Sequence, residues 1–243
     1  MDEPSLILII AALFTSTLSG MMGMGGGILL LTVMMNYFPP VVVIPLHGLV
    51  QLSSNSFRLA MNISHLVKTI FFPAIVGAIF GGIFGYFFVV DLPENLFRII
   101  MGLFILFLTW VPISKFIPVL IVGRRKKFFL VEFVATFSSL FVGATGPLLA
   151  PFFLSENLNR KEIVATKAGC QMMTHVLKIL VFFINGFIFS EYLVLVLSMV
   201  LATLIGTYMG KKLLGRLSDK SFKWVFKGLI SVLAIRALVR GVL

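Results

Sequence analysis

The sequence predicts an all-α polytopic membrane protein built from two inverted repeats, each with one glycine-broken helix and three transmembrane helices. Three observations support this fold class. The chain of 243 residues is 59% hydrophobic and 12% charged, with a mean hydropathy of +1.10, a profile far from that of soluble domains. Most of its apolar segments are long enough to cross a bilayer, which takes about 20 helical residues. Glycines, glutamines and basic residues also recur at a constant offset between the two halves.

The apolar segments divide the chain into two halves joined by a basic linker. The first half, residues 1–114, and the second half, residues 128–243, flank the linker 115–127, which contains the run GRRKK. The net charge of +11 is attributed to basic residues in cytoplasmic loops, and binding of nucleic acid is not expected. The expected segments are 5–22, 27–36, 41–66, 70–90 and 95–113, then 128–142, 147–154, 161–186, 190–212 and 220–240.

The two halves form an internal repeat. A shift of 120 residues places Gly23 on Gly143, Gly26 on Gly146, Gln51 on Gln171, and Arg58 on Lys178. Internal repeats are the common plan of secondary transporters.

The positive charges predict how the repeats are oriented in a cell membrane. If each broken segment enters and leaves on one side, the basic residues outside the apolar segments all lie inside except Arg98, Arg236 and Arg240. If every long segment crossed instead, the same residues would divide almost equally between the two sides. The charge distribution therefore favours inverted repeats. It leaves open whether the broken segments re-enter or cross with a sharp bend.

Two glycine-rich breaks, GMGGG at 23–27 and GATGP at 143–147, occupy equivalent places in the repeats. Non-helical backbone at membrane depth is tolerated where it is buried in protein or lines a cavity. A helix that starts after each break would direct its free N–H groups and its positive dipole end at a bound anion. The alternative is that the glycines only permit close helix packing. The candidate substrate-binding residues of the breaks are Gly23, Gly25, Gly26, Gly143, Thr145 and Gly146.

A polar stripe follows each break, because offsets of four, eight and eleven residues place four polar side chains on one helical face. Inverted repeats would place Arg58 and Lys167 toward the inside, and His47 and Lys178 toward the outside. The alternative interpretation is interhelical hydrogen bonding together with snorkelling of the basic side chains. The candidate substrate-binding residues are Gln51, Asn55, Arg58, Gln171, Thr174, His175 and Lys178, and His47 and Lys167 would attract the anion along the pathway.

The acidic residues disfavour transport of a cation. All nine are expected in loops or at segment ends, and Glu132 is expected near the inner surface because it follows Lys127 by five residues. A carboxylate proton relay or sodium site is therefore not expected, and His175 is the residue able to couple protons. Three scattered histidines and one cysteine form no metal site. No cofactor and no enzymatic activity are expected, and homo-oligomerisation is left open.

Four stretches carry a resemblance that covers nearly the whole chain: LSGMMGMGGGILLL, SSLFVGATGPLLAPFF, GAIFGGIFGY and LIGTYMGKKLLGRLSDKSFKWVFKGLI. They resemble the sulfite exporter TauE/SafE family of membrane permeases. The resemblance implies transport of sulfite or a small organosulfonate, whereas the residues themselves indicate only a small anion. The break GATGP departs from the family by having fewer glycines. The alternatives are an anion channel with the same midplane site and a membrane scaffold or sensor that transports nothing.

Overall fold

The computed structural model describes residues 3–22, 25–88, 93–111, 123–213 and 219–242, and all their regular structure is helical. The all-α class predicted from the sequence is therefore confirmed. The first half contains α1 (Glu3–Met22), α2 (Gly26–Met34), α3 (Pro40–Ala60), a 3-10 turn (Ile63–His65), α4 (Lys68–Tyr86) and α5 (Glu94–Trp110). The second half contains α7 (Arg124–Val142), α8 (Gly146–Leu154), α9 (Arg160–Ile184), a 3-10 turn (Phe189–Tyr192), α10 (Leu193–Lys212) and α11 (Asp219–Val242).

The end of α3 and the start of α7 differ from the expected segments. The helix expected over 41–66 ends at Ala60, where the Asn62 side chain donates a 2.9 Å hydrogen bond to the carbonyl of Arg58 and closes the last turn. In the second half, α7 begins at Arg124, inside the predicted linker. The rest of that linker, residues 115–122, lies outside the described residues.

The distribution of apolar side chains is that of a multi-pass membrane protein. Four helices of the described residues are long and apolar enough to span a bilayer: α1, α4, α9 and a segment that includes α10. Large apolar side chains such as Phe72, Phe80 and Leu201 are exposed on the outside, whereas a row of polar residues is buried inside. Exposed apolar surface on this scale fits contact with lipid rather than water.

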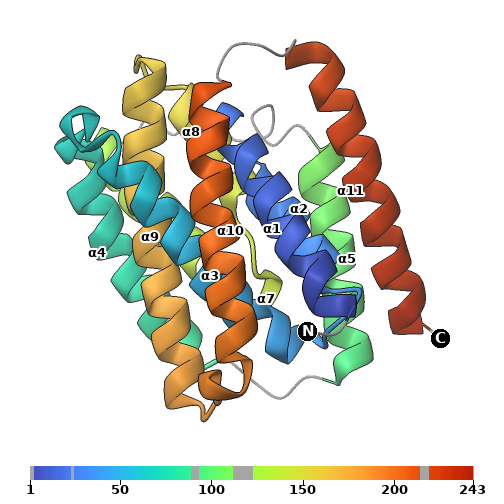
Figure 1. Ribbon diagram of the computed structural model, residues 1–243. Coiled ribbons are helices and arrows are strands. Elements are labelled where there is room, and N and C mark those ends of the chain that lie inside the picture. The colour runs from blue at the N-terminus through green and yellow to red at the C-terminus, as the bar shows by residue number, and fades with distance from the viewer. Residues whose placement is uncertain (1–2, 23–24, 89–92, 112–122, 214–218, 243) are drawn as a thin grey trace.

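Two helix pairs, each with one member from either half, pack antiparallel: α3 with α9 and α5 with α11. Where α3 and α9 cross, Gly48 lies against Lys178, and Gly169 lies against Leu59. The beginning of each helix therefore faces the end of the other. Helices α5 and α11 are also antiparallel, since the end of α11 packs against the start of α5. These two lie side by side at the right of Figure 1.

The first helix of each half packs in parallel against a helix of the other half. A methyl group at Gly77 or Gly81 of α4 would overlap the carbonyl oxygen of Phe129 or Phe133 in α7. Helix α10 packs against α1 in the same way through its own glycines. Small residues let helix backbones approach this closely. Each half is thus completed by contacts with the other.

Helices α1 and α2 form a hairpin that enters and leaves at one end of the bundle. Gly26 packs against Thr15 and Ser19, so α2 turns back along α1. Just beyond α2, the ring of Phe38 lies 5.9 Å from that of Tyr192, which precedes α10. Because α10 is parallel to α1, this is also the end at which the chain begins. Figure 1 shows both chain termini there.

Helices α7 and α8 form a second hairpin, which opens at the opposite end. Glu156, just after α8, accepts hydrogen bonds from Arg124 at 2.7 Å and from Lys127, both in the first turn of α7. Partial burial raises the pKa of Glu156, but the ion pairs with Lys127 and Arg124 outweigh it and hold the pKa below its ordinary value. Charged side chains thus join the two ends of this hairpin.

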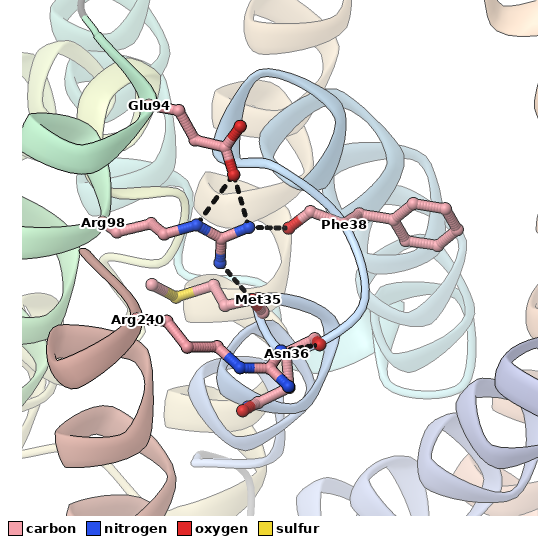
Figure 2. A network of polar contacts seen from close by, with 6 residues as sticks. All are labelled: Met35, Asn36, Phe38, Glu94, Arg98 and Arg240. Atoms are coloured by element: carbon pink, nitrogen blue, oxygen red, sulfur yellow. Dashed lines mark hydrogen bonds and ion pairs between the residues drawn. The ribbon is translucent and has the colours of Figure 1, made fainter. Parts of the chain in front are cut away.

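Arginines hold the end of the first hairpin in place. Arg98 of α5 donates to the carbonyl oxygens of Met35 at 2.5 Å and Phe38 at 3.3 Å, and it pairs with Glu94 at 2.6 Å (Figure 2). Arg240 of α11 donates to the carbonyl oxygen of Asn36. The last carbonyls of a helix lack intrahelical partners and carry partial negative charge, so cationic donors there are favourable.

We expect Arg98→Met to lower the free energy of unfolding by about 3 kcal/mol, because two carbonyls lose charged donors worth about 1.5–3 kcal/mol each. The matched control is Glu94→Gln, whose carboxylate side chain is 51% exposed. An exposed ion pair contributes only about 0–1 kcal/mol. Melting of the purified protein in detergent measures both. Equal shifts in the two variants would contradict this role of Arg98.

Candidate functional site

The breaks in both hairpins contain backbone that only glycine adopts readily. Gly25, the residue before α2, has φ 100°, and Gly143, the residue after α7, has φ 75°. A side chain at either position would strain the backbone. Helix α8 follows Thr145, and no side chain caps the first turn of α2 or α8. In α2 the N–H groups of Ile28 and Leu29 already donate to the carbonyl of Gly25, and Pro147 in α8 has no N–H. The N–H groups of Gly27 and Gly146 remain for a ligand.

A cavity lies between the two breaks and the polar faces of α3 and α9. The two hairpins contribute backbone and small side chains, and the two long helices contribute amide, imidazole and cationic groups. The lining residues are Ser19, Gly25, Gly27, Ile28, His47, Gln51, Arg58, Ala144, Thr145, Gly146, Pro147, Lys167, Gln171 and His175.

The two glutamines occupy equivalent positions against the helix starts. A methyl group placed on Gly27 would lie 3.2 Å from the Gln51 amide. One placed on Gly146 would lie 3.0 Å from Nε2 of Gln171. Each glutamine therefore lies against the first turn of the short helix in its own half. Amide N–H groups and helix N–H groups converge on the same space, as an anion site requires.

Basic side chains lie toward both ends of the cavity. Arg58 and Lys167 are both at least 95% buried and interact electrostatically with each other. Toward the other end, the rings of His47 and His175 meet edge to face at 5.9 Å. A buried cation is costly unless another charge or a ligand compensates it. This arrangement favours negative charge in the space between.

Two of the basic residues also hold the breaks together. Nε2 of His47 donates to the carbonyl oxygen of Gly27 at 2.8 Å, since a carbonyl can only accept. Nζ of Lys178 donates to the carbonyl oxygen of Gly143 at 2.5 Å. Gly143 ends α7, where a carbonyl is left without a helical partner. Lys178, expected from the sequence among the anion-binding residues, therefore lies behind the break and is not one of the lining residues.

Arg58 is positioned by its own helix. Its Nη2 donates to Oδ1 of Asn55 at 2.9 Å, and Nδ2 of Asn55 donates to the carbonyl oxygen of Gln51 at 2.8 Å. Asn55, expected at the anion, is thus a buried residue that orients Arg58 and does not line the cavity. Gly26 likewise packs inside the first hairpin, and Gly23 lies outside the described residues.

Glu132 differs most from its expected position. It is 0% exposed, and its Oε1 accepts a 2.7 Å hydrogen bond from the hydroxyl of Thr174. The sequence predicts a position near the inner surface, whereas the structure places it within α7 with its side chain fully buried in the protein. Five residues after Lys127 amount to about 7.5 Å along the helix axis, which is far enough to bury the side chain between α7 and α9. Thr174, expected at the substrate, contacts Glu132 and does not line the cavity.

The sequence interpretation also missed some lining residues. Gly27 and Pro147 belong to the breaks and follow positions that were named, so the glycine-rich pattern itself was sufficient to include them. Ala144 also lies inside the second break, whereas Ser19 and Ile28 carry no sequence signal that separates them from ordinary core residues.

The comparisons with known proteins gave one match. A family model described as Sulfite exporter TauE/SafE matches residues 8–237. No curated protein and no solved structure matches the chain.

Proposed function

Because the chain belongs to the sulfite exporter TauE/SafE family, whose members are membrane transporters, we propose that it carries a small sulfur oxyanion, sulfite or a small organosulfonate, across the cell membrane. The anion binds in the cavity between the two breaks. First-turn N–H groups of α2 and α8 and the amides of Gln51 and Gln171 contact its oxygens. Arg58 and Lys167 attract it from one side, and His47 and His175 lie toward the other.

One observation carries this proposal: two uncapped helix starts, each with a glutamine against it, converge on a cavity that also contains buried cations. Neutral donors at the centre favour a ligand that binds and then leaves, because a central ion pair would hold it more tightly. The sulfur chemistry of the substrate comes from the family and not from the cavity.

We further propose that the protein works by alternating access between inverted repeats, with the two hairpins moving relative to α3 and α9. The antiparallel packing of α3 with α9 and of α5 with α11 supports inversion, since these are equivalent helices. The hairpins are also fastened at opposite ends, one by Arg98 and Arg240 and the other by Glu156.

The test is counterflow of radiolabelled sulfite and methanesulfonate in proteoliposomes. Gln51→Leu and Gln171→Leu should each lower the apparent affinity about tenfold or more, because a hydrogen bond to a charged ligand is worth about 1.5–3 kcal/mol. The control Ser53→Ala removes a polar group on α3 that bonds to the carbonyl of Leu49 and does not line the cavity. It should transport like the wild type.

Three outcomes would contradict the proposal. Glutamine variants that transport normally would place the anion elsewhere. Flux without counterflow, accompanied by single-channel currents, would indicate a channel. A folded wild type that moves neither anion would indicate a scaffold, a sensor or another substrate class.

A further inference from the structure

Glu132 is a buried carboxylate that the proposed anion site does not use. Its Oε1 accepts from the hydroxyl of Thr174 at 2.7 Å, and that hydroxyl lies 2.9 Å from the hydroxyl of Thr136. Its Oε2 is buried and has no hydrogen-bond partner. Within the described part of the chain, Glu132 forms no ion pair. An ionised carboxylate in this position is costly unless a nearby charge compensates it.

The compensating charge comes from the anion cavity. Lys167 lines the cavity and lies on α9 about two turns before Thr174, on the same side of the helix as this partner of Glu132. Its positive charge favours the ionised form of Glu132. Helix α8 has no ionisable residue. The ionisable residues of the other helices packed against α7 are Arg58 and His47 on α3, Lys68 and Tyr86 at the ends of α4, and the paired Glu94 and Arg98 on α5.

The position is not duplicated in the first half. The residue equivalent to Glu132 by the shift of 120 is Ala12, which is also fully buried. The residue equivalent to Thr174 is Ser54, whose hydroxyl lies 3.4 Å from that of Thr207. The symmetric cavity therefore does not require Glu132. A glutamate occurs at this position in the second half alone, so the free-energy cost of burying its carboxylate needs an explanation other than the symmetric cavity.

We propose that Glu132 is a proton-binding site that couples transport of the sulfur oxyanion to movement of a proton across the membrane. The inference rests on the proposed function and extends it by naming the coupling ion. With the cavity empty, Lys167 balances the ionised carboxylate. An anion in the cavity engages Lys167 and adds negative charge nearby, so Glu132 takes a proton from the aqueous phase onto Oε2.

Release reverses these events. When the anion leaves, Lys167 again faces Glu132, the O–H bond breaks, and the proton passes to the aqueous phase that received the anion. Because linkage is reciprocal, the protonated protein binds the anion more tightly, as the bound anion favours protonation. Anion and proton therefore move in the same direction, and the gradients of both decide the direction of net transport.

The test separates coupling from transport by using methanesulfonate, which stays ionised throughout the assay, whereas sulfite itself takes up protons. Proteoliposomes containing a trapped pH dye report proton movement while labelled methanesulfonate reports anion flux. In the wild type we expect flux to acidify the compartment that receives the anion, and a pH gradient to drive accumulation.

Glu132→Gln keeps the shape of the protonated side chain but binds no proton. It should retain counterflow and lose gradient-driven accumulation by about tenfold, the effect of roughly 1.4 kcal/mol of lost coupling. Glu132→Asp keeps a carboxylate and should retain proton movement. Ser54→Ala, which removes the hydroxyl at the position equivalent to Thr174, should remain coupled.

The possible results distinguish failure of the proton-coupling proposal from failure of the proposed transport function. Wild-type flux without proton movement, or accumulation driven by a sodium gradient instead, would overturn the inference even if Glu132→Gln failed to fold. It would also be overturned by a coupled Glu132→Gln, or by a folded Glu132→Gln without counterflow, which would make Glu132 part of anion binding. A wild type that moves neither methanesulfonate nor sulfite would overturn the proposed function itself.

Discussion

Gly26→Ala is expected to prevent the first hairpin from closing and to lower the free energy of unfolding by about 3 kcal/mol or more, at the upper end of overpacking costs. The added methyl group would overlap the carbonyl oxygen of Thr15 and the hydroxyl of Ser19. The serine hydroxyl can rotate away, but the carbonyl belongs to the backbone of α1 and cannot. The two helices would therefore have to separate.

Melting of the purified protein in detergent, followed by size-exclusion chromatography, measures this effect. The control is Gly228→Ala, because a methyl group at that exposed position of α11 would meet nothing within 4 Å. It should melt at or slightly above the wild-type temperature, since alanine is the better helix former. If Gly26→Ala melted like the control, the close packing of α2 on α1 would be wrong.

Gly27→Ala and Gly146→Ala are expected to leave the fold intact and to reduce transport about tenfold or more. Here the added methyl group would meet the ends of flexible side chains, the amides of Gln51 at 3.2 Å and Gln171 at 3.0 Å. Those amides can move aside, so stability changes little. Moving them takes donors away from the anion and narrows the cavity, with a cost of about 1.5–3 kcal/mol in binding.

This prediction is tested by measuring the apparent affinity for sulfite in counterflow. Thermal melting of each variant checks that it is folded, and Gly228→Ala is the control. Comparable losses in both variants would support equal use of the two breaks. A loss in only one would assign the anion to that half. Normal affinity in both folded variants would contradict the placement of the anion between the breaks.

Much of the fold followed from sequence because membrane-spanning helices are continuous apolar stretches of the chain and can be recognised without knowing their tertiary contacts. The long apolar segments, the two glycine breaks and the basic residues on one side required only hydropathy and charge to interpret. The polar stripes were equally visible, since His47, Gln51 and Arg58 stand at helical spacing in an apolar segment. Helix α3 is buried along this stripe, and α9 faces it with the corresponding residues.

What the sequence did not provide was the partner of each polar side chain. Lys178 and Arg58 stand at equivalent positions, yet Lys178 bonds to the break at Gly143 whereas Arg58 lines the cavity. Whether the cation at this position bonds to the break or lines the cavity depends on the distance between α9 and the end of α7. That distance is set by tertiary packing, which the sequence pattern does not reveal. The burial of Glu132 depends likewise on how α7 lies against α9. Arg98 was assigned to the outer surface without any indication that it binds the end of α2.

The parallel packing of α1 on α10 and of α4 on α7 has a consequence for how the protein is made. When the first half leaves the ribosome, the glycine face of α4 has no partner until α7 is synthesised, and α1 waits longer still for α10. Until then the first half has only its internal contacts, such as α2 against α1 and Arg98 against the end of α2. A chain truncated after α5 would therefore lack the close glycine contacts that α1 makes with α10 and α4 makes with α7.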